Sequence, residues 1–130
     1  MESPLDLYRA VRSRFPAVTE KADAEHRRLG LEVNAKYLYL WFESLATALN
    51  REMAQGVSFL LHEPLFLFLA GALSAGGREV GECIDVAFVE NLFWKVRAEQ
   101  AQPYWQGMPS TLKELYMAFF QCGPQPFDHA

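Results

Sequence analysis

Apolar residues occupy every side of the segment 83–96 when it is placed on a helix. At about 100° per residue, its Ile, Val, Phe, Leu and Trp side chains point in all directions, which is typical of a helix enclosed by other helices. We therefore expect residues 83–96 to form a buried central helix. Glu90 and Asn91 lie within it, so each is predicted to be a buried structural polar group that needs a partner. For Glu90 we expect an arginine or a tyrosine from another helix.

Three segments before the central helix carry helix signals. Ser3 can cap a first helix that ends at Pro16. Residues 17–29 favour helix but are nearly all polar, which predicts a solvent-exposed helix with few contacts to the body. Asn34 can cap a long amphipathic helix that runs to about Ala54, with Asn50 on its solvent face.

The next apolar segment is residues 64–75, with Pro64 well placed in the first turn of a helix. Residues 57–61 before it can be extended or can lead into that helix, because periodicity does not separate the two in so short a run. A turn at 76–81 then leads to the central helix. After it, residues 97–109 read as a polar loop whose Tyr104 folds back over the core.

A capping box, Thr111 to Glu114, marks the last helix at 109–121. Its predicted apolar face contains residues at helical spacing, namely Leu112, Leu115, Tyr116, Phe119 and Phe120. The tail at 125–130 is expected to be loose. Together these segments predict an all-α single domain, residues 1–130, with five or six helices around the central one.

Composition agrees with a globular fold and gives limited information on function. The 130 residues are 51% hydrophobic and 22% charged, far from the disordered class. Net charge is −4, and residues 57–130 carry the whole acidic excess. This balance argues against nucleic acid or an anionic membrane as a partner and is compatible with a cationic protein partner. The start has no signal-peptide pattern and no apolar run reaches about 20 residues, so we expect a cytoplasmic protein.

Catalytic and metal-binding signatures are not apparent in the sequence. The three histidines, His26, His62 and His129, have no partner at a spacing typical of a metal site. Cys83 and Cys122 lack a nearby basic cluster that would activate a thiol, and Cys83 fits a small core residue. We therefore expect no metal, no cofactor and no enzymatic activity.

The acidic stretch Glu79, Glu82 and Asp85 has two interpretations. Acidic residues are ordinary at the start of a helix, where the dipole favours them. They can also form a contact surface for a basic partner, and they are our candidate partner-binding residues. The aromatic residues at 37–42 are most simply core, but they can instead line a small apolar ligand cavity or a homodimer seam.

Several core and capping motifs resemble those of a family of small bacterial helical proteins. They are the segment at 84–94, Tyr104-Trp105, Met108-Pro109 and the helix at 112–119. That family looks like the immunity-type proteins found beside polymorphic and contact-dependent toxins, and the resemblance covers about residues 37–121. It implies a cytoplasmic, non-enzymatic protein that binds and neutralises a cognate toxin domain. The alternative is a helical homodimer or a protein that binds a small apolar ligand.

Overall fold

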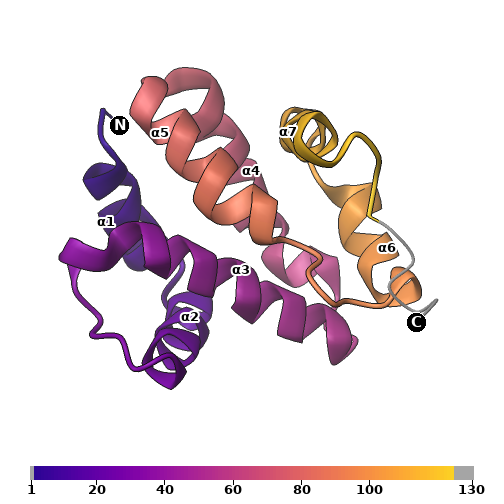
Figure 1. The fold of residues 1–130 in the computed structure, drawn as a ribbon, viewed down its shortest axis with the longest axis horizontal. Coiled ribbons are helices and arrows are strands. Elements are labelled where there is room, and N and C mark those ends of the chain that lie inside the picture. Colours follow the sequence, from indigo (N-terminus) through magenta and orange to yellow (C-terminus); the bar gives the residue numbers. More distant parts are fainter. Residues whose placement is uncertain (1, 125–130) are drawn as a thin grey trace.

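The fold, a computed structural model that describes residues 2–124, is all-α, with seven α-helices and no strand in that range (Figure 1). The tail at 125–130, which includes His129, lies outside the described residues. The α-helices are α1 Pro4–Arg14, α2 Pro16–Arg28, α3 Leu38–Ala54, α4 Phe59–Ala75, α5 Arg78–Glu82, α6 Ala98–Gly107 and α7 Ser110–Phe120. Three short helices are the 3-10 turns η1 Ala35–Tyr37 and η3 Val89–Asn91 and the π-helical η2 Cys83–Phe88. The predicted all-α class is confirmed, but the predicted loop at 97–109 is helical, as α6.

Helix α1 and the start of α3 follow their capping signals. The Oγ of Ser3 accepts a hydrogen bond from the backbone N–H of Asp6 at 3.1 Å, as expected for a cap. Asn34 Oδ1 accepts from the N–H of Lys36 at 2.8 Å, where η1 leads into α3. These local contacts lie within four residues along the chain, which is why the sequence predicts them well.

Helix α2 is not the solvent-exposed helix that its polar composition predicts. It packs along α3 and buries Thr19, Asp23 and His26 on one face, together with Ala22. Leu29, which we expected to contact the body, is 68% exposed. Polar side chains replace apolar ones on the inner face because each finds a partner there, as shown below.

Helix α4 begins five residues before the predicted start, at Phe59, where Ser58 Oγ accepts from the N–H of Leu60 at 3.2 Å. Pro64 is therefore inside the helix and exposed rather than in its first turn. The helix ends before Gly76, as predicted. The short apolar run at 57–61 is thus largely the start of α4, and no strand forms there.

The central helix differs most from its prediction, because it spans residues 78–91 as α5, η2 and η3 rather than 83–96. Leu92 is extended, and Phe93 and Lys95 have positive φ values of 68° and 56°, which no helix accommodates. It is also not enclosed on all sides, since Val86 is 46% exposed. The fully buried residues of this segment are Cys83, Ile84, Ala87, Phe88 and Val89.

One side chain of α3 holds the end of the central helix. Asn50 Nδ2 donates to the carbonyl oxygen of Asn91 at 2.9 Å, and Asn50 Oδ1 accepts from the N–H of Phe93 at 2.8 Å. Asn50 is 8% exposed, so its predicted place on the solvent face is wrong. Sequence periodicity could not show this role, because the partners are more than 40 residues away along the chain.

The residues at the C-terminal end pack on the core through fewer positions than predicted. In α7, Leu112 and Tyr116 are buried, whereas Phe119 is 55% exposed. The predicted capping box does not form, and the Oγ1 of Thr111 is buried without a hydrogen-bond partner. Tyr104 of α6 does fold into the core, 1% exposed, and donates to the carbonyl of Val57 at 2.8 Å.

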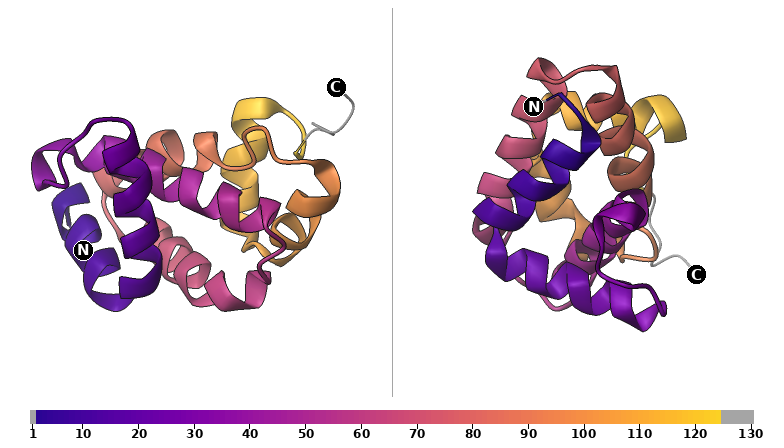
Figure 2. Two further views of the ribbon diagram at one scale, coloured as in Figure 1. Left: turned by 90° about the horizontal axis from the view of Figure 1, so that it is seen from below. Right: turned by 90° about the vertical axis from the view of Figure 1, so that its left-hand side faces the viewer.

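The arrangement separates the molecule into two ends (Figure 1). Helices α1 and α2 lie at one end and α6 and α7 at the other, while α3 runs between them beside the central helix. The two further views show the N-terminus at the α1 and α2 end (Figure 2). Trp41 and Phe42 are fully buried in the α3 part of the core.

Candidate binding site

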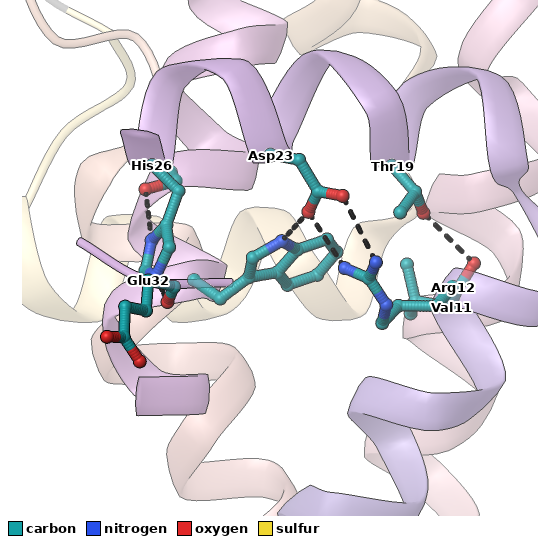
Figure 3. A network of polar contacts seen from close by, with 8 residues as sticks. Val11, Arg12, Thr19, Asp23, His26 and Glu32 are labelled. Carbon is teal, nitrogen blue, oxygen red and sulfur yellow. Dashed lines mark hydrogen bonds and ion pairs between the residues drawn. The ribbon is translucent and has the colours of Figure 1, made fainter. Parts of the chain in front are cut away.

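The polar contacts of α2 begin with an ion pair at Asp23 (Figure 3). Arg12 of α1 donates from Nη1 and Nη2 to the two carboxylate oxygens at 2.8 and 3.1 Å. The indole Nε1 of Trp41 donates to Asp23 Oδ1 at 2.7 Å. Burial opposes ionisation of Asp23, but these hydrogen bonds outweigh it and hold the pKa of the carboxyl below its ordinary value. The group is therefore a charged structural link between three helices.

His26 makes a second link on the same face of α2. Its Nδ1 is 3.1 Å from Ser44 Oγ, and its Nε2 is 3.0 Å from the backbone carbonyl oxygen of Glu32 (Figure 3). The ring is fully buried. Both nitrogens are thus occupied by partners within the chain, and the histidine ties the 29–34 loop to α3.

Glu52 of α3 forms the third link. Its Oε1 accepts from Lys21 Nζ and from His62 Nε2, each at 2.9 Å. Burial opposes ionisation, yet the hydrogen bond from Lys21 and then the one from His62 leave the Glu52 pKa lowered. The same carboxylate contributes, after burial, to a Tyr104 pKa of about 12. The polar groups of α1, α2 and α3 are therefore arranged in pairs.

Beside His62 is a cleft of about 260 Å³ between the α1–α2 junction and α4. Its walls are mainly apolar, with Phe15, Val18 and Leu65 among the lining residues. Arg14 and Lys21 are its other charged lining residues. A small apolar ligand is the class such a space can hold, and it lies away from the aromatic residues at 37–42 that we considered for that role.

The three predicted partner-binding residues lie on the central helix. Glu79 and Glu82 are exposed and Asp85 is half-buried. Among the described residues, none of the three forms an ion pair or a side-chain hydrogen bond. Both glutamates lie near Tyr39 of α3, whose pKa is raised by burial first and then by Cys83, Glu82 and Glu79. The structure therefore brings these acids together on a surface that includes an exposed tyrosine.

Glu90 and Asn91 are each half-buried rather than enclosed. Asn91 Nδ2 donates to the carbonyl of Ala87 at 2.9 Å. Glu90 has neither the arginine nor the tyrosine partner that the sequence predicts, in the part of the chain that the structure describes. Desolvation, with a smaller contribution from Asp85, raises its pKa. Glu90 is thus a carboxylate at the surface with no compensating cation.

Glu90 faces a cleft that the sequence does not reveal. The cleft has a volume of about 330 Å³ and is lined by Glu90, Asn91, Trp94, Phe119 and Phe120. Trp94 is 66% exposed and Phe120 is 39% exposed, so the aromatic walls are accessible. We call these five residues the aromatic cleft. The one sequence signal was the crowding of aromatic residues in both segments, which we interpreted as core.

Reactive groups elsewhere are held in structural roles. Cys83 is fully buried, and desolvation raises its pKa to about 12, so its thiol is a core group as predicted. Within residues 2–124 there is no cluster of three or more His, Cys, Asp or Glu that could hold a metal ion. No described helix is both long enough and apolar enough to span a bilayer.

Comparisons with known proteins give one result. Neither the curated proteins nor the solved structures include a significant match to the chain. A family model matches residues 8–122, which is most of the sequence. The aromatic cleft, the central helix and the paired groups of α1 to α3 all lie within that span. The chain therefore belongs to the DUF7674 family, a domain of unknown function.

Proposed function

We propose that the chain is a non-enzymatic, immunity-type protein that binds and neutralises a cognate toxin domain. The contact surface is the acidic side of the central helix, with Glu79, Glu82 and Asp85 facing a basic partner. The observation that supports this proposal is that these carboxylates have no ion pair within the described residues, whereas the buried carboxylates of α2 and α3 all do. The immunity assignment rests on the resemblance of the segment 37–121.

The charge distribution favours a cationic partner. Four carboxylates lie within residues 78–91, where Arg78 is the one basic residue. Like charges three or four residues apart on a helix repel one another, so this segment tolerates a small electrostatic cost. A basic surface would remove that repulsion and would also speed association by electrostatic steering. Complementary charge is therefore the most direct use of this surface.

Side chains suited to catalysis are engaged in structural contacts instead. His26 uses both ring nitrogens, and His62 uses Nε2 for the pair with Glu52. The thiol of Cys83 is inaccessible. These contacts support a binding role over acid–base or nucleophilic chemistry.

The proposal is tested by co-expressing the chain with the product of a neighbouring toxin-like reading frame. The double variant Glu82→Lys with Asp85→Lys should slow association about tenfold or more at low salt, since it reverses the charge of the steering surface. The matched control, Glu20→Lys with Glu114→Lys, changes net charge equally at exposed positions outside that surface. Equal association rates for both double variants would contradict the proposed surface, and failure of the wild-type chain to bind would contradict the toxin partner.

A second candidate function, as a homodimer, is favoured by an exposed side of α4. Leu60 and Leu67 are 71% and 58% exposed, and Pro64 and Gly71 lie at the same helical spacing. Residues 64–77 contain no charged side chain. The seam that the sequence suggested at 37–42 is wrong in part, because Trp41 and Phe42 are fully buried.

Light scattering over a range of protein concentrations tests this second candidate. A homodimer through α4 should give twice the chain mass, 14.8 kDa, at high concentration. Leu67→Glu should return the protein to the monomer mass, because it places charge in an apolar contact. A single chain mass at all concentrations would exclude the homodimer.

A further inference from the structure

The aromatic cleft combines three features that a positively charged, planar group recognises. Its walls carry aromatic rings from two elements, the 92–97 turn and α7, and its polar residues are Glu90 and Asn91. Aromatic faces attract cations, and a carboxylate beside them adds a charge-assisted hydrogen bond. At about 330 Å³ the space suits one side chain rather than a helix.

The backbone presents Trp94 to solvent by an unusual conformation. The residues on either side of it, Phe93 and Lys95, both have positive φ, which is uncommon for residues other than glycine. Phe93 is fully buried and packs edge-on against Tyr116, with ring centroids 5.4 Å apart. Burial of Phe93 and the hydrogen bonds from Asn50 hold this turn, so Trp94 is directed outward by the surrounding structure.

The opposite wall is also supported from beneath. The rings of Phe120 and Tyr116 are 4.4 Å apart, and Tyr116 is itself buried. Phe119 meets Phe120 edge-on at 4.7 Å and is 55% exposed. Large aromatic side chains that are accessible yet held in place are typical of the residues that dominate binding energy at interfaces.

The charge of the cleft needs an external cation. Glu90 has no ion pair within the described residues and lies near Asp85, a second unpaired carboxylate. The nearest basic side chain shown is Lys95, whose Nζ lies 5.7 Å from the Trp94 ring centroid. That contact shows that this ring attracts cations, while the Glu90 carboxylate still lacks one.

From this geometry we infer that the aromatic cleft binds an arginine side chain of the partner protein. The guanidinium group stacks on the Trp94 ring and donates to Glu90 and to the side-chain oxygen of Asn91. Arginine suits the site better than lysine, because its planar fork can stack and donate in two directions at once. This inference rests on the proposed function, since it names the partner group that the acidic surface attracts.

The first experiment needs no partner. The ¹⁵N-labelled chain is titrated with N-acetyl-arginine amide, with its neutral isostere N-acetyl-citrulline amide, and with N-acetyl-lysine amide, and the NMR signals of the Trp94 indole and the Asn91 amide are followed. Arginine should shift both signals and bind about tenfold more tightly than citrulline. Equal binding of citrulline, tighter binding of lysine, or no shift at Trp94 would each overturn the inference.

Variants separate the cleft from general electrostatics. Trp94→Ala and Glu90→Gln should each weaken arginine binding about tenfold, because each removes one half of the recognition. Glu114→Gln, at an exposed position of α7 outside the cleft, should leave it unchanged. Melting curves check that every variant is folded. Arginine affinity that survives Glu90→Gln, or that falls equally in the control, would overturn the inference.

The toxin complex distinguishes failure of this inference from failure of the proposed function. If the Glu82 and Asp85 charge reversal weakens the complex but Trp94→Ala does not, the binding function stands and the arginine site is wrong. If arginine binds selectively but the neighbouring gene product does not bind, the cleft is confirmed as an arginine site and the toxin assignment is wrong.

Discussion

Carboxylates at the two ends of the molecule have opposite environments. Asp23, Glu25 and Glu52 of α2 and α3 are buried, and each has at least one arginine or lysine partner. Asp85 and Glu90 of the central helix are half-buried and have none among the described residues. The first group holds helices together, and the second group is open to a partner.

The pKa directions follow the same division. The pKa values of Asp23 and Glu52 are lowered because hydrogen bonds outweigh the desolvation that opposes them. The pKa values of Asp85 and Glu90 are raised, chiefly by desolvation. A folded chain thus stabilises one set of charges and disfavours the other, which is the contrast expected between structural and contact residues.

The largest effect is expected when a paired carboxylate is removed. Asp23→Asn should lower the free energy of unfolding by about 3 kcal/mol, because it leaves the Arg12 guanidinium without its anion and weakens the contact with the Trp41 indole. Urea denaturation at neutral pH measures the change. Asp85→Asn is the matched control at an unpaired position. A similar loss in both variants would remove the distinction between the two groups.

An intermediate effect is expected from pH. A carboxylate with a lowered folded pKa adds stability above its unfolded pKa, and this stability is lost as pH falls through the folded value. For Asp23 and Glu52 the ordinary values are 3.8 and 4.5, so the loss should occur below about pH 4.5. Glu52→Gln should be less stable at neutral pH and lose less on acidification. Denaturation midpoints measured from pH 7 to 3 test this, and parallel curves for the two proteins would contradict it.

The smallest effect, with the opposite sign, is expected at Glu90. A raised folded pKa means that the folded state holds its proton more tightly, so the ionised group costs stability at neutral pH and this cost disappears as pH falls. Glu90→Gln should therefore stabilise the free protein by a few tenths of a kcal/mol at pH 7. Thermal melts at low ionic strength measure it. A clear loss of stability would show that Glu90 has a structural role.

The sequence predicts the parts of the fold that depend on local contacts. The caps at Ser3 and Asn34 and the apolar face of α3 are read correctly because their partners lie within a few residues. The inner face of α2 is missed because periodicity counts apolar residues, whereas Asp23 and His26 are buried by partners at least eleven and six residues away. Burial of polar groups depends on the tertiary structure.

The candidate site was predicted only in part. The acidic residues of the central helix were identified because charge can be read directly. The aromatic cleft was missed because its two walls lie far apart along the chain, and because the positive φ values at Phe93 and Lys95 leave no residue-type signal such as glycine. Without that turn, Trp94 and Phe119 are indistinguishable from core residues.

The π-helical stretch Cys83–Phe88 also limits how this protein can vary. A π turn closes through residues five apart, one more than an α turn, and here the N–H of Val89 reaches the carbonyl of Ile84. Deleting a single residue from this stretch would restore the regular spacing and rotate everything after it by about 100°. Glu90 and Trp94 would then no longer face α7. Homologues of different length in this stretch should therefore differ in what they bind, even where every lining side chain is retained.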